Sequence, residues 1–490
     1  MKRNIRFLAL MMAILMMLTC FAGCKKGTEA TDSEGSESEV MPTASDVTSS
    51  DDTVSGKNSG ESKTESGSKA TSGTASGSSG SSAKPVSGKT ATGWDAIKAS
   101  MPKELRGKQI EIFHWNPSSE LPGAAKMLSN FKKQTGINVK WTVASYDNYD
   151  VELQARITAG KSPDIVLFQW MNASRMNLCQ PIANSGYDFT TSEWDTAVAN
   201  YYSVNGKTYA VNMKDTLLNR PEAIFYNRSN IEKYGFEDPY TLWKNGQWTE
   251  DKFMEMCKAF KTKTSKPAWV VSKYDIWTLI SGLQGEISYS NGKYSNGLTD
   301  KRAVAAWQKC ADLYHEGLID RTWDIDGFCN GTYLFMDSSL MFARSTQPYF
   351  AKLKSEGTIG FVPFFTLKGQ TAYYQSMNEY EAYGIAKGAK NALAAAYFLR
   401  YYLDPETYDE KEFFCTAEAL EVYQYCMKQP NRIMHNRCPL GSGNSTSPAA
   451  EVQLALEGAT AAQVPSILSK YTNKIDSVVA DLNNRLKKIK

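Results

Sequence analysis

The sequence predicts an α/β protein, because strand patterns and helix patterns alternate at the start of its folded region. Apolar strand patterns cover residues 110–115, 137–143 and 164–168, and helical patterns with apolar residues in i, i+4 register cover 123–134 and 148–159. This is a βαβαβ order. Such units form parallel sheets, and ligands gather beyond the carboxyl ends of their strands.

The predicted strand ends carry aromatic and amide side chains. Trp115 ends the first strand and Asn116 follows it, Tyr146 follows the second, and Gln169 and Trp170 follow the third. A buried core places its aromatics along strands, although any one of these rings could instead pack beneath a loop. Aromatics at all three ends favour a ligand-binding role, and we take these five residues as candidates.

The N-terminus is predicted to be an export signal. Basic residues at 2, 3 and 6 precede an apolar run at 7–18, which is shorter than the roughly 20 residues of a spanning helix. The following Phe21-Ala22-Gly23-Cys24 resembles the lipobox of bacterial lipoproteins. That resemblance implies cleavage of a signal peptide at 1–23 and lipidation of Cys24. Cys20 is the other candidate, although Leu18-Thr19 before it fits cleavage less well, and a further alternative is an ordinary signal peptide with an incidental cysteine.

Residues 24–92 are predicted to be a disordered tether, and 93–490 the folded domain. From residue 27 to 92 the chain has no Leu, Ile, Phe, Tyr or Trp and is rich in Ser, Gly and Thr, so it cannot bury enough apolar area to offset its chain entropy. As a flexible coil it would reach about 45 Å. We expect it to hold the domain away from a membrane surface.

Charge and cysteine counts exclude several classes. Lys and Arg number 55 against 52 Asp and Glu, which gives no basic excess for nucleic acid. Three His and no Cys-x-x-Cys make a zinc site unexpected. Seven cysteines lie beyond Cys24, so an exported chain keeps at least one free thiol, and Cys257 and Cys310 fall in helical patterns where burial is expected.

A family resemblance extends over about residues 105–485. The order and spacing of several segments are similar to those of bacterial extracellular solute-binding proteins of ABC importers, the sugar-type family 1. The segments include GKQIEIFHW, NFKKQTGINVKWTVASYDNYDVELQARITAGKSPDIVLF, NGKTYAVNMK, AIFYNRSNIEKYGF, AVAAWQKCADLYHEGLI, FCNGTYLFMD, IGFVPFF and YGIAKGAKNALAAAYFLRYYL.

This resemblance implies a two-lobed periplasmic-binding-protein-like fold of type II, with discontinuous lobes joined by crossover hinges. Lobe one would comprise about 105–212 and 383–437, and lobe two about 223–375 and 447–490. The hinges would lie near 213–222, 376–382 and 438–446. A monomer without cofactor or metal is expected. Hinge residues absorb the backbone rotation when such lobes close on a ligand.

The resemblance also implies where a ligand would bind. Tyr274 and Trp277 occupy the position at which sugar-binding relatives place stacking aromatics, although a customary Gly-x-Trp downstream is replaced here by Ser338-Ser339-Leu340-Met341-Phe342. A pyranose has an apolar C–H face edged by hydroxyls, which suits aromatic rings combined with planar polar groups. Further polar candidates are Asp215, Arg344, Glu379 and Tyr380.

The expected function is therefore capture of a carbohydrate, most simply an oligosaccharide, outside the cell membrane and its delivery to ABC permease subunits. Three alternatives stay open: another small solute, a sensor subunit that signals to a membrane receptor, and an exported carbohydrate-active enzyme. The enzyme would need two carboxylates across a scissile bond. Asp215, Glu379 and Glu381 are available for that role.

Overall fold

The computed structural model describes residues 93–146, 148–168, 172–271, 287–298, 300–434 and 448–489, apart from the side chains of 378, 379, 448–450 and 453. The predicted signal peptide, Cys24 and the tether lie outside these residues. Within the described ranges, none of the helices combines the length and hydropathy that crossing a membrane requires.

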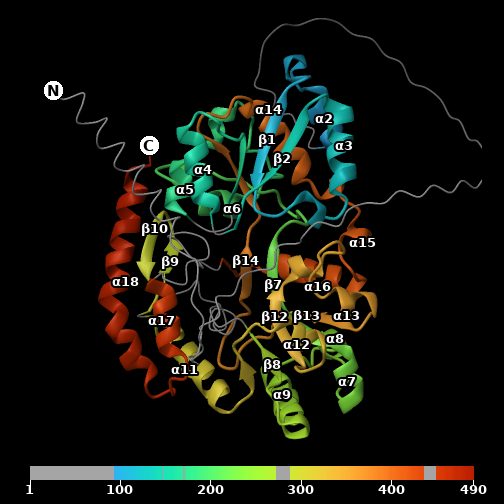
Figure 1. Ribbon diagram of the computed structural model, residues 1–490, viewed down its shortest axis with the longest axis vertical. Coiled ribbons are helices and arrows are strands. Elements are labelled where there is room, and N and C mark those ends of the chain that lie inside the picture. The colour runs from blue at the N-terminus through green and yellow to red at the C-terminus, as the bar shows by residue number, and fades with distance from the viewer. Residues whose placement is uncertain are drawn as a thin grey trace, which may run out of the picture. The chain divides into compact units, whose positions relative to one another are not determined.

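The first of two large sheets contains five strands in the order β2-β1-β3-β15-β4 (Figure 1). β1 pairs in parallel with both β2 and β3, whereas β15 is antiparallel to β3 and β4. The βαβαβ prediction is confirmed by β1, α3, β2, α4 and β3. Its strands are β1 (Gln109–His114), β2 (Asn138–Val143), β3 (Ile165–Phe168), β4 (Cys179–Gln180) and β15 (Ala382–Ala386).

Helices flank this sheet and complete what we call the first lobe. The sequence sets the bounds of α3 by glycine at both ends, because Gly123 and Gly136 adopt left-handed φ values of 74° and 75°. The helices are α2 (Trp94–Ala99), α3 (Ala124–Thr135), α4 (Tyr149–Thr158), α5 (Ala173–Asn177), α6 (Thr196–Tyr201) and α14 (Ala392–Tyr402). Short elements are η1 (Lys103–Leu105), η2 (Ser118–Glu120), η3 (Ile182–Ser185), β5 (Ser203–Val204) and β6 (Lys207–Thr208).

The second large sheet forms the core of the second lobe. Its strand order is β11-β8-β12-β7-β14-β16, with β13 also paired to β7. β7 is buried at every residue because strands pair with it on both sides. The strands are β7 (Arg220–Asn227), β8 (Trp269–Val270), β11 (Ile319–Asp320), β12 (Phe335–Ser339), β13 (Ile359–Val362), β14 (Gln375–Glu379) and β16 (Arg432–Met434).

The helices of the second lobe are amphipathic or short. In α9, Phe253, Met256, Cys257 and Phe260 are buried at the i, i+3, i+4, i+7 spacing of one helix face, and Thr249 caps the N-terminus. The elements are α7 (Arg228–Tyr234), α8 (Pro239–Lys244), α9 (Glu250–Thr264), α11 (Lys301–His315), α12 (Ile325–Cys329), η4 (Leu340–Ala343), α13 (Ala351–Ser355), η5 (Pro405–Thr407), α15 (Glu410–Phe413) and α16 (Ala417–Met427).

Two segments cross between the lobes side by side. Val211 forms an antiparallel bridge with Tyr383 in the first lobe, and Arg220 pairs with Glu379 in the second. Residues 212–219 and 380–381 therefore lie between paired residues at both ends of the passage, and we call them the crossing segments. β7 and β14 lead into them (Figure 1).

The predicted extent of lobe one, 383–437, is wrong at its end. α14 packs on β15 and β1, but α16 packs on β13 and β7, and β16 pairs with β14 of the second sheet. The chain thus leaves the first lobe between α14 and α15. The helical pattern of α16 indicated an apolar face without indicating which sheet receives it. The predicted third hinge, 438–446, lies outside the described residues.

The C-terminal helix contacts both lobes. α17 (Pro448–Leu456) packs on α18 (Val464–Lys487), and α18 contacts the hairpin of β9 (Ile287–Ser290) and β10 (Lys293–Asn296). In the first lobe, Ser174 Oγ accepts a 3.1 Å hydrogen bond from Arg485, and Asn205 donates one of 3.0 Å to the Ile489 carbonyl. Assigning 447–490 to the second lobe alone is therefore incomplete.

Candidate functional site

The carboxyl end of β1 presents an aromatic pair. Trp115 and Tyr146 are both half-buried, and their ring centroids lie 5.1 Å apart at an interplanar angle of 74°. The buried Nε1 of Trp115 has no hydrogen-bond partner within the described structure. This corner of the first lobe therefore offers ring surface together with one unused N–H donor.

Asn116 lies in a loop that the protein itself holds in place. Its backbone N–H donates to His114 Nδ1 over 2.7 Å, and its carbonyl accepts from Trp141 Nε1 over 2.9 Å. Its amide nitrogen donates to the Glu120 carboxylate. Its Oδ1 is buried without a partner among the described residues, so the loop is fixed while one acceptor remains unused.

The second lobe reaches this corner through the segment after η4. Thr346 Oγ1 donates to the Glu120 carbonyl over 2.8 Å, and Gln347 Nε2 donates to Glu120 Oε2 over 3.1 Å. Gln347 is only 4% exposed, yet its Oε1 has no partner in the part of the chain that the structure describes. Trp115 Nε1, Asn116 Oδ1 and Gln347 Oε1 are thus three unused polar atoms from both lobes.

A buried ionic cluster surrounds Glu381, a residue of the crossing segments, beside them. Arg220 Nε donates to Glu381 Oε2 over 2.9 Å, and Arg220 Nη2 forms an ion pair with the same oxygen at 2.8 Å. Tyr383 donates to Oε1 over 2.8 Å, and His114 Nε2 lies 3.3 Å from the same oxygen. We call Glu381, Arg220, His114, Tyr383 and the nearby Arg344 the Glu381 cluster.

Arg344 is engaged by protein groups. Its Nη2 donates to the Leu218 carbonyl over 2.7 Å and lies 3.7 Å from Glu381 Oε2, while its guanidinium lies 5.5 Å from the Phe413 ring centroid. These partners belong to a crossing segment and to the second lobe. Arg344 therefore braces the crossing, with its Nε unpaired among the described atoms.

The cluster fixes two protonation states. Burial acts to raise the pKa of Glu381, but Arg220, the His114 hydrogen bond and Arg344 outweigh it and hold that pKa well below its usual range. Burial lowers the pKa of His114; the two arginines act in the same direction, and Glu381 opposes them. At neutral pH, Glu381 is a carboxylate and His114 is neutral. A general acid for glycoside hydrolysis needs a raised pKa, so Glu381 is unsuited to that role.

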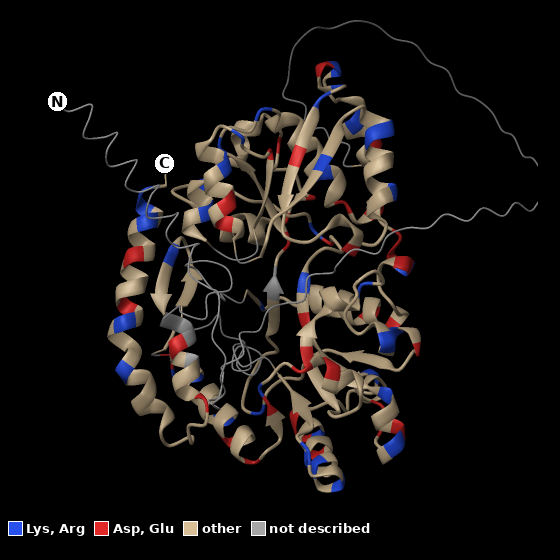
Figure 2. Ribbon diagram, in the orientation of Figure 1, with Lys and Arg blue, Asp and Glu red and all other residues tan. Residues whose placement is uncertain are grey.

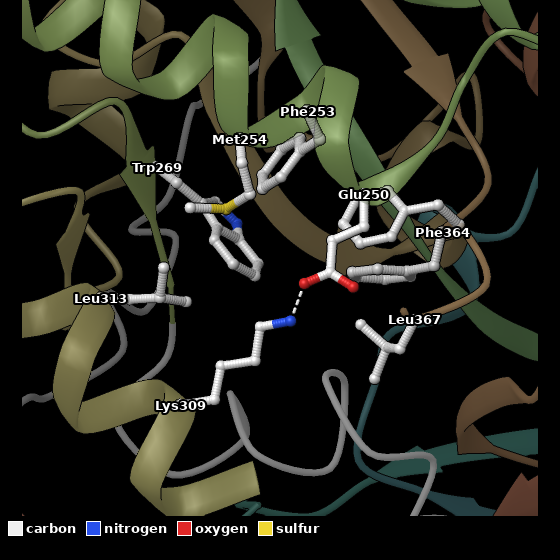
Figure 3. Close-up of a pocket in the computed structure, with 9 residues that line it drawn as sticks. Glu250, Phe253, Met254, Trp269, Lys309, Leu313, Phe364 and Leu367 are labelled. Atoms are coloured by element: carbon white, nitrogen blue, oxygen red, sulfur yellow. Dashed lines mark ion pairs between the residues drawn. The ribbon is translucent and has the colours of Figure 1, made fainter. Parts of the chain in front are cut away.

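A small pocket lies in the second lobe and is lined by other residues. Figure 3 shows Glu250 at the start of α9 facing Lys309 of α11, with Trp269 and Phe364 beside them. Glu250 forms an ion pair with Lys309 and accepts a 2.6 Å hydrogen bond from the Lys368 backbone. This pocket is apolar apart from the Glu250–Lys309 ion pair, and both oxygens of its carboxylate are already paired.

Elsewhere the charges are dispersed. Figure 2 shows basic and acidic residues interspersed along outer helices such as α9 and α18. The described residues contain no group of His, Cys, Asp and Glu arranged to hold a metal ion. Cys257 and Cys310 are buried, as expected, and all six described cysteines are free thiols.

The fold and the sequence identify the family. A family model of bacterial extracellular solute-binding proteins matches residues 126–411. The chain belongs to this family. The family consists of binding proteins that act outside the cell, which agrees with a two-lobed fold crossed by paired segments. No curated protein matches the sequence.

Solved structures of solute-binding proteins share the fold. A lacto-N-biose-binding protein of Bifidobacterium longum matches with a TM-score of 0.57 at 16% identity, over 76% of this chain and 97% of its own. The cycloalternan complex of a Listeria monocytogenes ABC substrate-binding protein gives 0.55 at 14%, over 76% and 99%. The sugar-binding protein MalE of Xanthomonas citri gives 0.57 at 12%, over 78% and 100%.

The remaining predicted site residues of this solute-binding protein fall in three places. Asp215 is exposed in a crossing segment, with a left-handed φ of 58°. Tyr380 is buried in the other, and the Arg432 guanidinium lies 5.8 Å from its ring centroid. The Glu379 backbone is in β14, but its side chain lies outside the description, as do Gln169, Trp170, Tyr274 and Trp277.

Sequence reasoning missed several residues of this region. Glu120 and Gln347 are 227 positions apart, and His114 and Glu381 are 267 apart. No local periodicity links such residues. The available signal was weaker: His114 is the last residue but one of a predicted strand, and Glu381 lies in a predicted hinge.

Proposed function

We propose that this protein is a lipid-anchored extracellular subunit of an ABC importer that captures an oligosaccharide between its lobes. One observation carries the proposal: Trp115 and Tyr146 stand at the carboxyl ends of β1 and β2 beside three buried polar atoms without partners. Aromatic surface next to unused donors and acceptors matches the amphipathic character of a sugar ring.

The chemistry of the three atoms suits hydroxyl groups. Trp115 Nε1 is a donor, and Asn116 Oδ1 and Gln347 Oε1 are acceptors. A hydroxyl group can accept a hydrogen bond from Trp115 Nε1 and donate one to Asn116 Oδ1 or Gln347 Oε1. An ionised carboxylate or phosphate oxygen has no proton to donate to these two acceptors. A neutral polyol therefore fits this set better than an anion, and leaving such atoms unpaired costs about 1–3 kcal/mol each.

The structural neighbours point in the same direction. The Listeria protein was solved with cycloalternan and the Bifidobacterium protein with lacto-N-biose. At 14% and 16% identity, these two likenesses show the fold alone. We therefore propose the ligand class of this chain from its own residues near Trp115. Binding at ~1 μM requires about −8 kcal/mol. Stacking contributes ~0.5–1.5 kcal/mol per ring, so hydrogen bonds from both lobes are needed.

Calorimetric titration with a panel of neutral oligosaccharides tests the ligand class. We expect Trp115→Ala to weaken binding of the active glycan by about 10-fold or more, because ring stacking and the Nε1 donor are both lost. Trp243→Ala is the matched control, since Trp243 packs against Tyr240 and Tyr425 in the second lobe. The sugar assignment would be wrong if no glycan binds while a peptide, polyamine or phosphorylated solute does.

Anchoring is tested separately at Cys24. Two or more acyl chains contribute ~0.8 kcal/mol per buried CH₂, which is enough for stable attachment to a membrane. Cys24→Ala should therefore release the protein from the membrane fraction into the medium, while the parent stays with the membrane. An equal distribution of the two proteins would refute lipidation at this residue.

Delivery to a permease and signalling to a receptor differ in their consequences for the cell. Loss of the gene should abolish uptake of the identified glycan if the protein serves an importer. Unchanged uptake with a lost transcriptional response to the same glycan would instead establish a sensor subunit.

A further inference from the structure

One contact joins the proposed sugar platform to the opposite lobe. Trp115 directly follows β1 of the first lobe, and Arg220 is the first residue of β7 in the second. The Arg220 guanidinium carbon lies 5.1 Å from the centroid of the Trp115 ring, over its face. The indole is therefore positioned by a cation from outside its own lobe.

Arg220 is itself held firmly. It is 1% exposed, and two of its nitrogens converge on Glu381 Oε2 at 2.9 and 2.8 Å. Glu381 lies within a crossing segment, and its other oxygen accepts from Tyr383. The cation over the indole is therefore fixed to the passage between the lobes.

The same carboxylate also controls the residue before Trp115. His114 Nε2 lies 3.3 Å from Glu381 Oε1, and His114 Nδ1 accepts the Asn116 backbone N–H over 2.7 Å. Because Nδ1 is an acceptor here, the ring carries its proton on Nε2 and donates to Glu381. Three consecutive residues, His114, Trp115 and Asn116, are thus oriented by one buried pair.

We propose that Arg220 is a positioning residue that couples the orientation of the Trp115 ring to the arrangement of the lobes, with Glu381 as its anchor. The inference rests on the proposed function, because it gives the indole its role as a ligand platform. Rotation about the crossing segments displaces Arg220 against Trp115, and a ligand on the indole favours the arrangement in which the two stack. Such coupling is reciprocal: any change that stabilises the stacked arrangement of Arg220 and Trp115 also raises the affinity for the ligand.

The test uses the full chain labelled with 5-fluorotryptophan and observed by ¹⁹F NMR. Trp115→Phe identifies the Trp115 signal among those of the 11 tryptophans. Arg220→Met keeps the length of the side chain but removes its charge, and Arg220→Lys keeps the charge without the planar fork. The control is Arg228→Met, because Arg228 lies 5.2 Å from the Tyr226 ring centroid in the second lobe.

In the ligand-free protein we expect Arg220→Met to shift or broaden the Trp115 signal, Arg220→Lys to change it less, and Arg228→Met to leave it unchanged. The affinity for the active glycan should fall about 10-fold in Arg220→Met and less in Arg220→Lys. An unchanged Trp115 signal in folded Arg220→Met, or an equal change in Arg228→Met, overturns the proposal.

The ligand-free spectra separate this inference from the proposed function. If no glycan binds, the carbohydrate assignment fails, and the Trp115 signal alone decides whether Arg220 positions the ring. If Arg220→Met does not fold, Glu381→Gln replaces it: loss of the anchoring charge should move the same signal. An unmoved signal in folded Glu381→Gln then contradicts the proposal.

Discussion

Two neighbouring regions of this solute-binding protein treat buried polar groups in opposite ways. In the Glu381 cluster, both carboxylate oxygens accept hydrogen bonds, from Arg220 on one side and from Tyr383 on the other. Beside it, Trp115 Nε1, Asn116 Oδ1 and Gln347 Oε1 are buried without partners among the described residues. Because unpaired buried groups are costly, the first region serves the architecture and the second is suited to a ligand.

The largest effect should follow from removing Glu381. Glu381→Ala leaves Arg220 as a buried cation without its carboxylate, and breaking a buried pair in this way costs about 3–5 kcal/mol. Urea denaturation should show this loss as a lower midpoint. Asp251→Ala is the control, since its ion pair with Lys368 is about 75% exposed and should contribute less than about 1 kcal/mol. Equal urea midpoints for the two variants would show that the Glu381–Arg220 pair contributes no more to stability than an exposed ion pair.

Two buried glutamines sharpen the comparison. Gln347 has an unpaired Oε1, whereas Gln375 donates to the Glu222 carbonyl over 2.9 Å and accepts from Tyr373 over 2.8 Å. Gln347→Leu should change stability by less than about 1 kcal/mol but weaken glycan binding about 10-fold. Gln375→Leu should do the reverse, losing about 1–3 kcal/mol of stability with unchanged affinity. Calorimetry and urea titration on both proteins check this, and a similar profile for the two would remove the distinction.

The βαβαβ unit of the first lobe could be predicted from the sequence because its signals are local. The strand patterns and the glycines around 124–135 depend on residues only a few positions apart, and β1, α3, β2, α4 and β3 appear where expected. Trp115, Asn116 and Tyr146 lie just beyond strand ends, as the same logic predicts, and their role in ligand binding stays a prediction. The Glu381 cluster was not predictable, because Arg220 and Glu381 are 161 positions apart.

The lobe boundary failed for a related reason. An amphipathic helix indicates that one face is buried, and α16 buries Ala419, Val422, Tyr423 and Cys426 as its pattern suggests. Which sheet it covers depends on the direction of the chain after α14, and that is a tertiary choice. Arg344 is a candidate ligand contact in the sequence because it is polar and lies beyond the segment that replaces the customary Gly-x-Trp; its burial against Leu218 and Glu381 could be known only from the fold.

A smaller effect is expected from pH. The folded pKa of His114 is lowered, so between about pH 6.5 and that pKa the unfolded chain binds a proton that the native state does not. Stability is therefore complete above about pH 6.5 and falls on acidification, by up to about 1.4 kcal/mol per pH unit. The lowered pKa of Glu381 adds a second loss below about pH 4.5, in the same direction.

His114→Gln separates the two steps. The variant has no imidazole to titrate at position 114, so its melting temperature should decline less than that of the parent between pH 7 and 5, while the fall below about pH 4.5 remains. Differential scanning calorimetry across this range makes the comparison. Parallel curves for parent and variant would mean that His114 is protonated equally in both states, contrary to its burial beside two arginines.

The smallest effect on stability is expected at the pocket of Figure 3. A variant there tests whether ion pairing or burial accounts for the contribution of the Glu381 cluster to the free energy of unfolding. Glu250 and Lys309 are also paired, but Lys309 is 35% exposed. Solvent screens that cation, and Glu250 keeps the Lys368 backbone hydrogen bond if Lys309 is lost. Lys309→Met should therefore change stability by less than about 1 kcal/mol in urea and leave glycan affinity unchanged. A loss comparable to that of Glu381→Ala would mean that pairing alone dominates, since the two sites differ chiefly in their access to water.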